Sequence, residues 1–227
     1  MDNIKATLIH STPLTTVADT IRTAWQSHDK SDSVNGQLGE ADKQLIDRIG
    51  NKFKHGSVLE SLVYHFHLSG FPRSVLQELA RHRMASLTVK STRYTLKELK
   101  SEDPFDPLDS KSIERAKKYL CFPSSNKEVI DAQIKSLEYT AQLIKKGYSN
   151  DEVKPTLIES YRTECRWVIN ARSLQNLLSL RLDKATYKPF RVLALRIYQA
   201  LPESDKYLFE QCLPEQAELS KIEQISS

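Results

Sequence analysis

The segment Arg81–Arg93 gathers the side chains in this sequence that are best suited to hold an anion. Besides His82, it contains the four cations Arg81, Arg83, Lys90 and Arg93. It also contains three residues with a hydroxyl group before Thr92, namely Ser86, Thr88 and Ser91. Guanidinium groups offer fixed forks of donors that match phosphate oxygens, and nearby hydroxyl and backbone N–H groups can complete the cradle. The composition of this segment therefore predicts an anion-binding site.

A solvated basic face is the ordinary explanation of a run of charges. Here the cations are interleaved with the apolar residues Met84, Ala85, Leu87 and Val89, which indicates that the segment is partly buried. Buried cations need partners, and an anionic ligand would supply them. The preceding residues 77–81 are expected to be helical, so Gln77, Glu78 and Arg81 share one face and could line the same cleft.

A second group of polar residues belongs to a predicted helix at 173–182 and its approach. Arg172 and Asn176 are four residues apart, so they point the same way and offer a fork and an amide to a flat, heteroatom-rich ring. Arg181 continues the apolar stripe of this helix, formed by Leu174, Leu177 and Leu178. An unpaired guanidinium on that face would be costly. From the pattern alone, an anionic ligand and a salt bridge, to Asp183 or another acid, explain it equally well.

Strands and helices that could position these groups follow from the hydrophobic period. Alternation predicts strands at 4–8 and 62–68, the second ended by Gly70 and Pro72, and a strand or extended approach at 161–168. Helical spacing predicts helices after Pro13, with Val17, Ile21 and Trp25 inward, and around Leu45–Phe53. Further helices are expected after Pro72 and at 113–119, 127–146, 173–182, 190–197 and 204–212. We expect a single α+β domain over 1–227, with its core at about 4–201 and a central, mostly antiparallel sheet flanked by helices.

Composition and cysteine usage narrow the class of protein. The 227 residues are 39% hydrophobic and 27% charged, with a net charge of +4, which suits a globular chain and permits anionic partners. Cys121, Cys165 and Cys212 form no CxxC pair, so they are read as structural thiols in a cytoplasmic protein rather than as nucleophiles. No apolar run long enough for a membrane span is expected. His65 and His67 alternate on one strand face without a third ligand, and no metal site is predicted.

Three sequence blocks resemble the flavin-dependent thymidylate synthases. Arg81–Arg93 is similar to the motif RHRxxSxNxxSxR of that family, with Thr88 in place of Asn. Residues 170–181, from Asn170-Ala171-Arg172-Ser173-Leu174 to Leu180-Arg181, resemble NARSLxNFLxLR, and His55–Glu60 resembles HxxxxEH. The blocks keep their order, and the similarity runs from about residue 25 to residue 201.

The resemblance implies a methyltransferase that converts dUMP to dTMP with FAD. It implies NADPH as reductant, methylenetetrahydrofolate as carbon donor, and a homotetramer whose subunits share active sites. The residues that it places on FAD are His55, Ser57, Glu60, Arg81, His82, Arg83, Asn170, Arg172 and Asn176. Those that it places on dUMP are Gln77, Glu78, Arg81, Val89, Lys90, Ser91, Thr92, Arg93, Lys154 and Arg181. Among them Arg181 is the expected catalytic residue, a cation that stabilises a pyrimidine anion.

This chain departs from the family pattern at a few positions. Thr88 replaces Asn, Ser61 replaces His, Lys154 replaces Arg, and Ala185 stands near a position where His is frequent. Lysine keeps the charge at 154 but loses the bidentate fork. Two alternatives stay open: a basic nucleic-acid-binding protein without catalytic activity, which would contradict our expectation of no nucleic-acid partner, and a family member retained for structure or interaction.

Overall fold

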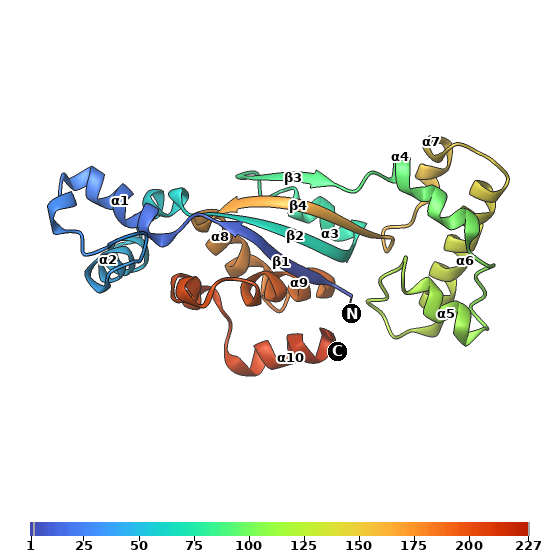
Figure 1. Cartoon of the computed structure of the whole chain (residues 1–227). Coiled ribbons are helices and arrows are strands. Elements are labelled where there is room, and N and C mark those ends of the chain that lie inside the picture. The colour runs from blue at the N-terminus through green and yellow to red at the C-terminus, as the bar shows by residue number, and fades with distance from the viewer. Residues whose placement is uncertain (2, 227) are drawn as a thin grey trace.

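A four-stranded antiparallel sheet forms the middle of the molecule (Figure 1). The computed structural model describes residues 1 and 3–226, and side chains as far as residue 224. The strands are β1 (Lys5–Ser11), β2 (Val63–Pro72), β3 (Ala85–Val89) and β4 (Arg162–Asn170), in the order β1-β2-β4-β3. All the strand pairs are antiparallel, so the α+β prediction with an antiparallel sheet is confirmed.

Alternation along the central strands sends one face of the sheet into the core. Tyr64, Phe66 and Leu68 of β2 are fully buried, whereas His65 between them is exposed. Of the two residues predicted to break this strand, Pro72 does end it, whereas at Gly70 β2 continues through a bulge between Ser69 and Phe71. Gly70 makes the bulge possible: its φ is +74°, and a Cβ there would lie 1.8 Å from the backbone oxygen of Asn3.

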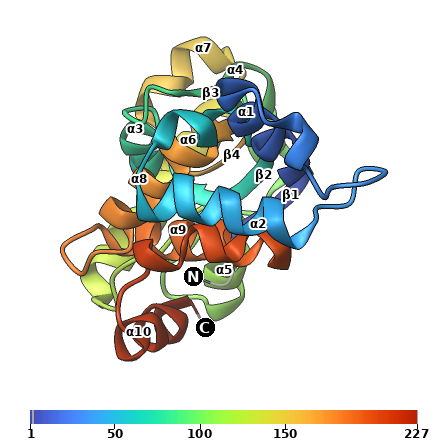
Figure 2. The same ribbon diagram turned by 90° about the vertical axis from the view of Figure 1, so that its left-hand side faces the viewer.

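Helices cover the buried face and both ends of the sheet. In Figure 1, α8 and α9 lie beneath the sheet with α10 below α9, α1 and α2 lie at one end, and α4, α5, α6 and α7 form a lobe at the other. The view along the long axis in Figure 2 places α9 and α10 on the same side of the sheet. The helices are α1 (Leu14–Trp25), α2 (Glu40–Ile46), α3 (Arg73–Leu79), α4 (Thr92–Thr95), α5 (Ser110–Ala116), α6 (Lys127–Lys145), α7 (Asn150–Val153), α8 (Ala171–Arg181), α9 (Lys188–Gln199) and α10 (Gln216–Ser226).

Two hydrophobic clusters hold this arrangement together. The larger one joins the sheet to α1, α2, α3, α8, α9 and α10, and the smaller one lies inside the lobe around Leu96, Tyr119, Leu137 and Tyr161. The lobe helix α6 matches its prediction closely and stops at Gly147, whose φ is +92°. The sheet unit and the lobe thus have separate interiors.

Several predicted helices end or pack differently from the expectation. Trp25 and Phe53, both expected to face inward, are 50% and 60% exposed. The helix around residues 45–53 is α2 followed by a π-helical turn at Asp47–Lys52, which rotates Phe53 away from the core.

The C-terminal helices also differ from the prediction. The predicted helix at 204–212 is two 3-10 segments, Glu203–Leu208 and Glu210–Cys212, and the helix α10 that follows was not predicted. In the part of the chain that the structure describes, no helix is long and apolar enough to cross a membrane.

Candidate functional site

A cavity of about 770 Å³ lies where the start of α8 meets the segment between α3 and β3. Its third wall is the 3-10 helix Gly56–Ser61, which supplies Glu60. The cavity is lined by Glu60, Arg81, His82, Arg83, Met84, Asn170, Arg172, Ser173, Asn176, Leu180 and Arg181. All of the residues predicted to hold FAD line it, except His55 and Ser57, which are exposed on the same 55–61 segment.

The first turn of α8 sets the direction of the polar groups in this cavity. The Asn170 side chain caps the helix by accepting a hydrogen bond from the backbone N–H of Ser173 at 2.8 Å. Leu174 and Leu178 are buried in the core, so the opposite side of the helix faces outward. Arg172 and Asn176 therefore project together into the cavity, as their spacing predicted.

A glycine lets the arginine of this turn lie flat against the neighbouring wall. A Cβ at Gly56 would come within 3.1 Å of the Arg172 side chain. From this position Arg172 donates a hydrogen bond from Nη1 to Glu60 Oε1 at 2.6 Å. The carboxylate orients the guanidinium at the mouth of the cavity.

The side chain of Arg181, at the end of α8, contacts three other side chains. Its Nη1 donates to Glu78 Oε2 at 2.7 Å, its Nε donates to His82 Nε2 at 3.2 Å, and its guanidinium lies 4.7 Å from the centre of the Phe190 ring. The side chain is 21% exposed. A salt bridge does exist, but its partner is Glu78 rather than Asp183, whose carboxylate accepts from the backbone N–H of Ala185 instead.

His82 is a neutral acceptor beside that cation. Its ring packs edge-on against Phe190 with the ring centres 6.2 Å apart. Burial, together with the nearby positive charge of Arg181, lowers the pKa of His82 to about 4. Because Nε2 accepts the hydrogen bond from Arg181, the ring proton is assigned to Nδ1.

The far end of the Arg81–Arg93 segment lies on a different part of the molecule. Arg93 in α4 makes a bidentate pair with Asp151 at the start of α7, with both N–O distances 2.8 Å. Lys90 pairs with Glu98 at 3.4 Å. Ser91 precedes α4 as its N-cap residue, and the exposed Lys154 follows α7. Of the remaining dUMP candidates here, Val89 ends β3 and Thr92 is buried.

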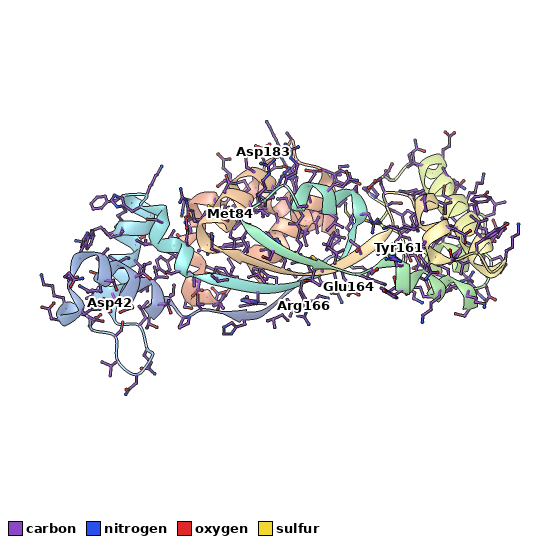
Figure 3. The ribbon with its side chains drawn as sticks, turned by 90° about the horizontal axis from the view of Figure 1, so that it is seen from above. Asp42, Met84, Tyr161, Glu164, Arg166 and Asp183 are labelled. Carbon is purple, nitrogen blue, oxygen red and sulfur yellow. The ribbon has the colours of Figure 1, made fainter. Side chains whose placement is uncertain are left out.

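The strand β3 separates the two groups of predicted dUMP residues. Extended chain advances by about 3.3 Å per residue, so the two end residues of this five-residue strand are roughly 13 Å apart. Met84, labelled at the beginning of β3 in Figure 3, marks the end that lines the large cavity. Glu78, Arg81 and Arg181 lie at that end, whereas Ser91, Arg93 and Lys154 belong to the lobe end. Gln77 lies apart from both and donates to Glu159 at 3.1 Å.

A second, smaller cavity of about 300 Å³ accompanies the lobe end. It joins Lys90, Ser91 and Tyr94 to the outward-facing residues His67 and Arg166 of the central strands. Figure 3 shows Glu164 and Arg166 on β4 at this part of the sheet. His67 was noted from the sequence only as a metal-ligand candidate that was rejected, and neither Arg166 nor the strand β3 was predicted. The alternation of Ala85, Leu87 and Val89 with Ser86 and Thr88 was a signal for β3.

The remaining candidates have structural partners. His67 contacts Glu164 at 3.2 Å, and among the described residues no group of His, Cys, Asp and Glu is placed to hold a metal ion. Cys121, Cys165 and Cys212 are free and buried, and burial raises the pKa of each thiol, for Cys165 to about 12. Protonated, buried thiols fit the structural role that was expected of them.

Comparison with known proteins explains why these groups occur together. The family model described as "Thymidylate synthase complementing protein" matches residues 7–204. A flavin-dependent thymidylate synthase from Wolinella succinogenes is 52% identical over 203 residues, which is 89% of this chain and 96% of the relative. The chain belongs to the flavin-dependent thymidylate synthase family. The resemblance stated from the three sequence blocks is confirmed, and the chain is an enzyme of the methyltransferase class.

Other members of the flavin-dependent thymidylate synthase family extend this result. An enzyme of that name from Campylobacter jejuni is 48% identical over 210 residues, covering 92% of this chain and 98% of the relative. A Helicobacter pylori thymidylate synthase of this type, solved with FAD and dUMP, is 44% identical, with a TM-score of 0.87 over 93% of this chain and all of that one. A UMP/dUMP methylase from Streptomyces cacaoi shares the fold, with a TM-score of 0.67 and 18% identity.

Proposed function

We propose that this enzyme binds FAD in the large cavity and methylates dUMP to dTMP, with methylenetetrahydrofolate as carbon donor and NADPH as reductant. The convergence of Glu60, the Arg81–Arg83 triplet and the first turn of α8 on one cavity is the observation that carries the proposal. These groups come from three separate blocks of the sequence. The fold brings them together around a space of a size that suits a cofactor.

The groups lining the cavity fit FAD chemically. Arg81 and Arg83 offer guanidinium donors for a diphosphate, and Arg172 and Asn176 offer a fork and an amide for a flat ring with several heteroatoms. Arg172 is already oriented by Glu60. When bound and reduced, the flavin supplies the hydride that completes the methyl group. The chain itself binds and orients the reactants.

Arg181 has the geometry expected of an electrostatic activator of the pyrimidine. A guanidinium carries five N–H donors, and the contacts with Glu78 and His82 use two of them. Because its contacts with Glu78, His82 and Phe190 fix its plane, donors on the third nitrogen, Nη2, can meet a uracil carbonyl and a deprotonated N3 without reorganisation. A neutral His82 matters here, since a second positive charge beside Arg181 would weaken its hold on Glu78.

The dUMP site requires a second copy of the chain in this proposal. Arg181 and Glu78 lie at one end of β3, whereas Ser91, Arg93 and Lys154 lie at the other, and Arg181 and Ser91 line different cavities. A homotetramer with shared active sites would let the lobe end of one subunit supply the phosphate contacts at the large cavity of another. Scattering measurements at micromolar concentration should show a tetramer, and a monomer that binds FAD and dUMP would contradict this arrangement.

The nucleic-acid alternative has less support than the enzyme. The cations of the Arg81–Arg93 segment do not form one continuous row for a phosphate backbone, because Arg81 and Arg83 line the large cavity whereas Lys90 and Arg93 lie at the other end of β3. An oligonucleotide titration over a range of salt concentrations checks this alternative, because binding to a backbone falls steeply with salt.

The function is tested on the purified protein in two steps. A flavin absorption spectrum that survives gel filtration is expected first. dUMP-dependent NADPH oxidation that yields dTMP only when methylenetetrahydrofolate is added is expected second. A protein that binds flavin but gives no dTMP under these conditions would be a family member kept for structure or interaction.

A further inference from the structure

Arg166 of β4 projects from the face of the sheet that is opposite to α8 and α9. Its neighbours Cys165 and Trp167 are buried, and Arg166 between them is exposed. Successive side chains of a strand point to opposite faces of the sheet, so the guanidinium lies on the outward face. Figure 3, in which the molecule is seen from above, labels Arg166 and Glu164 on this strand. The arginine is therefore outside the hydrophobic core and accessible to a ligand.

The strand register puts a polar side chain on each side of Arg166. Its directly paired residues are Thr88 of β3 and His67 of β2. Residues paired in this way have their side chains on the same face, about 5 Å apart. All three line the small cavity of about 300 Å³, which also includes Lys90 and Ser91. Arg166 thus belongs to the polar hollow at the lobe end of β3.

The guanidinium of Arg166 has no protein partner of its own among the described residues. Glu164, the acid that lines the same cavity, contacts His67 at 3.2 Å instead. Arg166 and Lys90 therefore outnumber the acid among the described lining residues, and the cavity favours an anion. A solvated arginine is common on protein surfaces, so the missing partner alone does not imply a ligand.

The other guanidinium at this end of β3 is already occupied. Arg93 donates both sides of its fork to Asp151, and Lys90 contacts Glu98. A phosphate would have to displace a carboxylate to reach either of these cations. Of the two guanidinium groups, Arg166 is the one that can meet a phosphate without first losing a carboxylate partner.

Hydroxyl groups beside Arg166 complete the chemistry of the small cavity. Ser91 is the N-cap residue of α4, but its side chain makes no capping hydrogen bond. The hydroxyl of Thr88 likewise has no partner among the described residues. A guanidinium fork with hydroxyl donors next to it suits phosphate, because each phosphate oxygen can accept several hydrogen bonds.

We propose that Arg166 is a further phosphate-binding residue of this enzyme and holds the phosphate of dUMP beside Ser91. This rests on the proposed function, in which the lobe end of one subunit supplies the phosphate contacts. Arg166 offers the phosphate a bidentate contact that requires no displacement, whereas Arg93 must first release Asp151.

The test compares the affinity for dUMP between variants, measured by calorimetric titration of the FAD-loaded protein. Arg166→Gln should raise the Kd for dUMP about five- to tenfold, because a charge-assisted contact is lost. Arg166→Lys should recover only part of the affinity, since the charge remains but the planar fork does not. A Kd for Arg166→Gln within about twofold of that of the unmodified protein would overturn the proposal.

Lys5 provides a matched control on the same face of the sheet. It is an exposed cation of the outer strand β1 and is not among the described residues that line the small cavity. Because β2 lies between β1 and β4, Lys5 and Arg166 are separated by roughly 10 Å or more. Lys5→Gln should leave the Kd for dUMP within about twofold. A loss of affinity equal to that of Arg166→Gln would indicate the general field of this face and overturn the assigned contact.

FAD content and oligomeric mass distinguish phosphate binding from two other roles of Arg166. Melting temperature, flavin absorbance and scattering are therefore measured for each variant before the titration. Loss of FAD in Arg166→Gln would place the residue on the cofactor, and loss of mass would place it between subunits; either result would overturn the assignment to dUMP. Formation of dTMP by the unmodified protein tests the proposed function separately, so an enzyme that binds dUMP without making dTMP leaves the Arg166 result interpretable.

Discussion

The two arginine–carboxylate pairs at opposite ends of β3 are built from similar groups in different surroundings. Arg181 and Glu78 have side chains that are 21% and 34% exposed, and Phe190 and His82 complete the enclosure. Arg93 and Asp151 are 60% and 55% exposed, although their bidentate geometry is better. Geometry alone would make the second pair the stronger one.

Exposure reverses that order. A surface pair contributes little, about 0 to 1 kcal/mol, because water and salt compete for both charges. Losing one member of a less exposed pair is more costly because the other charge then lacks a partner. The Arg181 end is therefore expected to be a fixed electrostatic element, and the Arg93 end an exchangeable one, in which the phosphate of the proposed function would replace the carboxylate of Asp151.

The largest effect is expected from removing the fixed cation. A charge-assisted hydrogen bond contributes about 1.5 to 3 kcal/mol, so Arg181→Ala should slow dTMP formation at least tenfold at saturating dUMP. Arg181→Lys should recover only part of the rate because the planar fork is lost. Single-turnover dTMP production in protein that retains FAD measures both. A rate for Arg181→Ala within about twofold of the unmodified enzyme would return Arg181 to a purely structural salt bridge.

The exchangeable end should act on binding instead of on the chemical step. Arg93→Met should weaken dUMP binding by roughly tenfold through loss of its phosphate contact, with little change in the rate at saturating dUMP. Comparing KM with kcat separates the two ends of β3. A fall in kcat of the size expected for Arg181→Ala would show that Arg93 also acts in the chemical step.

A pH effect should be confined to the fixed end, at His82. Its pKa in the folded protein is about 4, below its ordinary value of 6.5. Between these two values the unfolded chain binds a proton that the folded chain does not, so stability is present above about pH 6.5 and is lost as the pH falls towards 4. For a partly exposed ring we expect a loss of about 1 to 2 kcal/mol after discounting for solvent screening.

Chemical denaturation at pH 7 and pH 4.5, with His82→Gln as the comparison, measures the loss of stability that is due to His82. The variant should lose less stability over that interval than the unmodified protein. Equal losses would show that His82 titrates normally in the folded state.

Local spacing predicted the parts of the fold that depend on a single element. The face shared by Arg172 and Asn176 follows from one helix, and the buried row Tyr64, Phe66 and Leu68 follows from one strand. The strand β3 was not predicted because its alternation of apolar and polar residues covers only Ala85–Val89. The cations around it led us to interpret the whole segment as an anion-binding site. The π-helical turn at Asp47–Lys52 was missed because it changes the helical period on which the inward position of Phe53 was predicted.

The spacing of residues within one helix or strand could not predict contacts between segments that are distant in the sequence. Nothing in the neighbourhood of Arg181 in the sequence pointed to Glu78, which is more than a hundred residues away, and the nearby Asp183 was the obvious acid. The separation of Ser91 and Arg93 from Arg181 is likewise set by β3 in three dimensions. The sequence therefore predicted the residues of the candidate site, and the fold was needed to show that they lie at two separate ends of β3.

Asp151→Asn should have the smallest effect and tests the comparison most directly. If the exposed pair is exchangeable, dUMP must displace Asp151 from Arg93, so neutralising this carboxylate should tighten dUMP binding by about two- to fivefold while leaving the free energy of unfolding within about 0.5 kcal/mol. The same change at the other end, Glu78→Gln, should destabilise the protein because it leaves Arg181 without its anionic partner. Calorimetric dUMP titration and chemical denaturation of both variants provide the measurements. Similar losses of stability in the two variants would show that Arg93 is as fixed as Arg181, and exposure would then not be what distinguishes the two ends of β3.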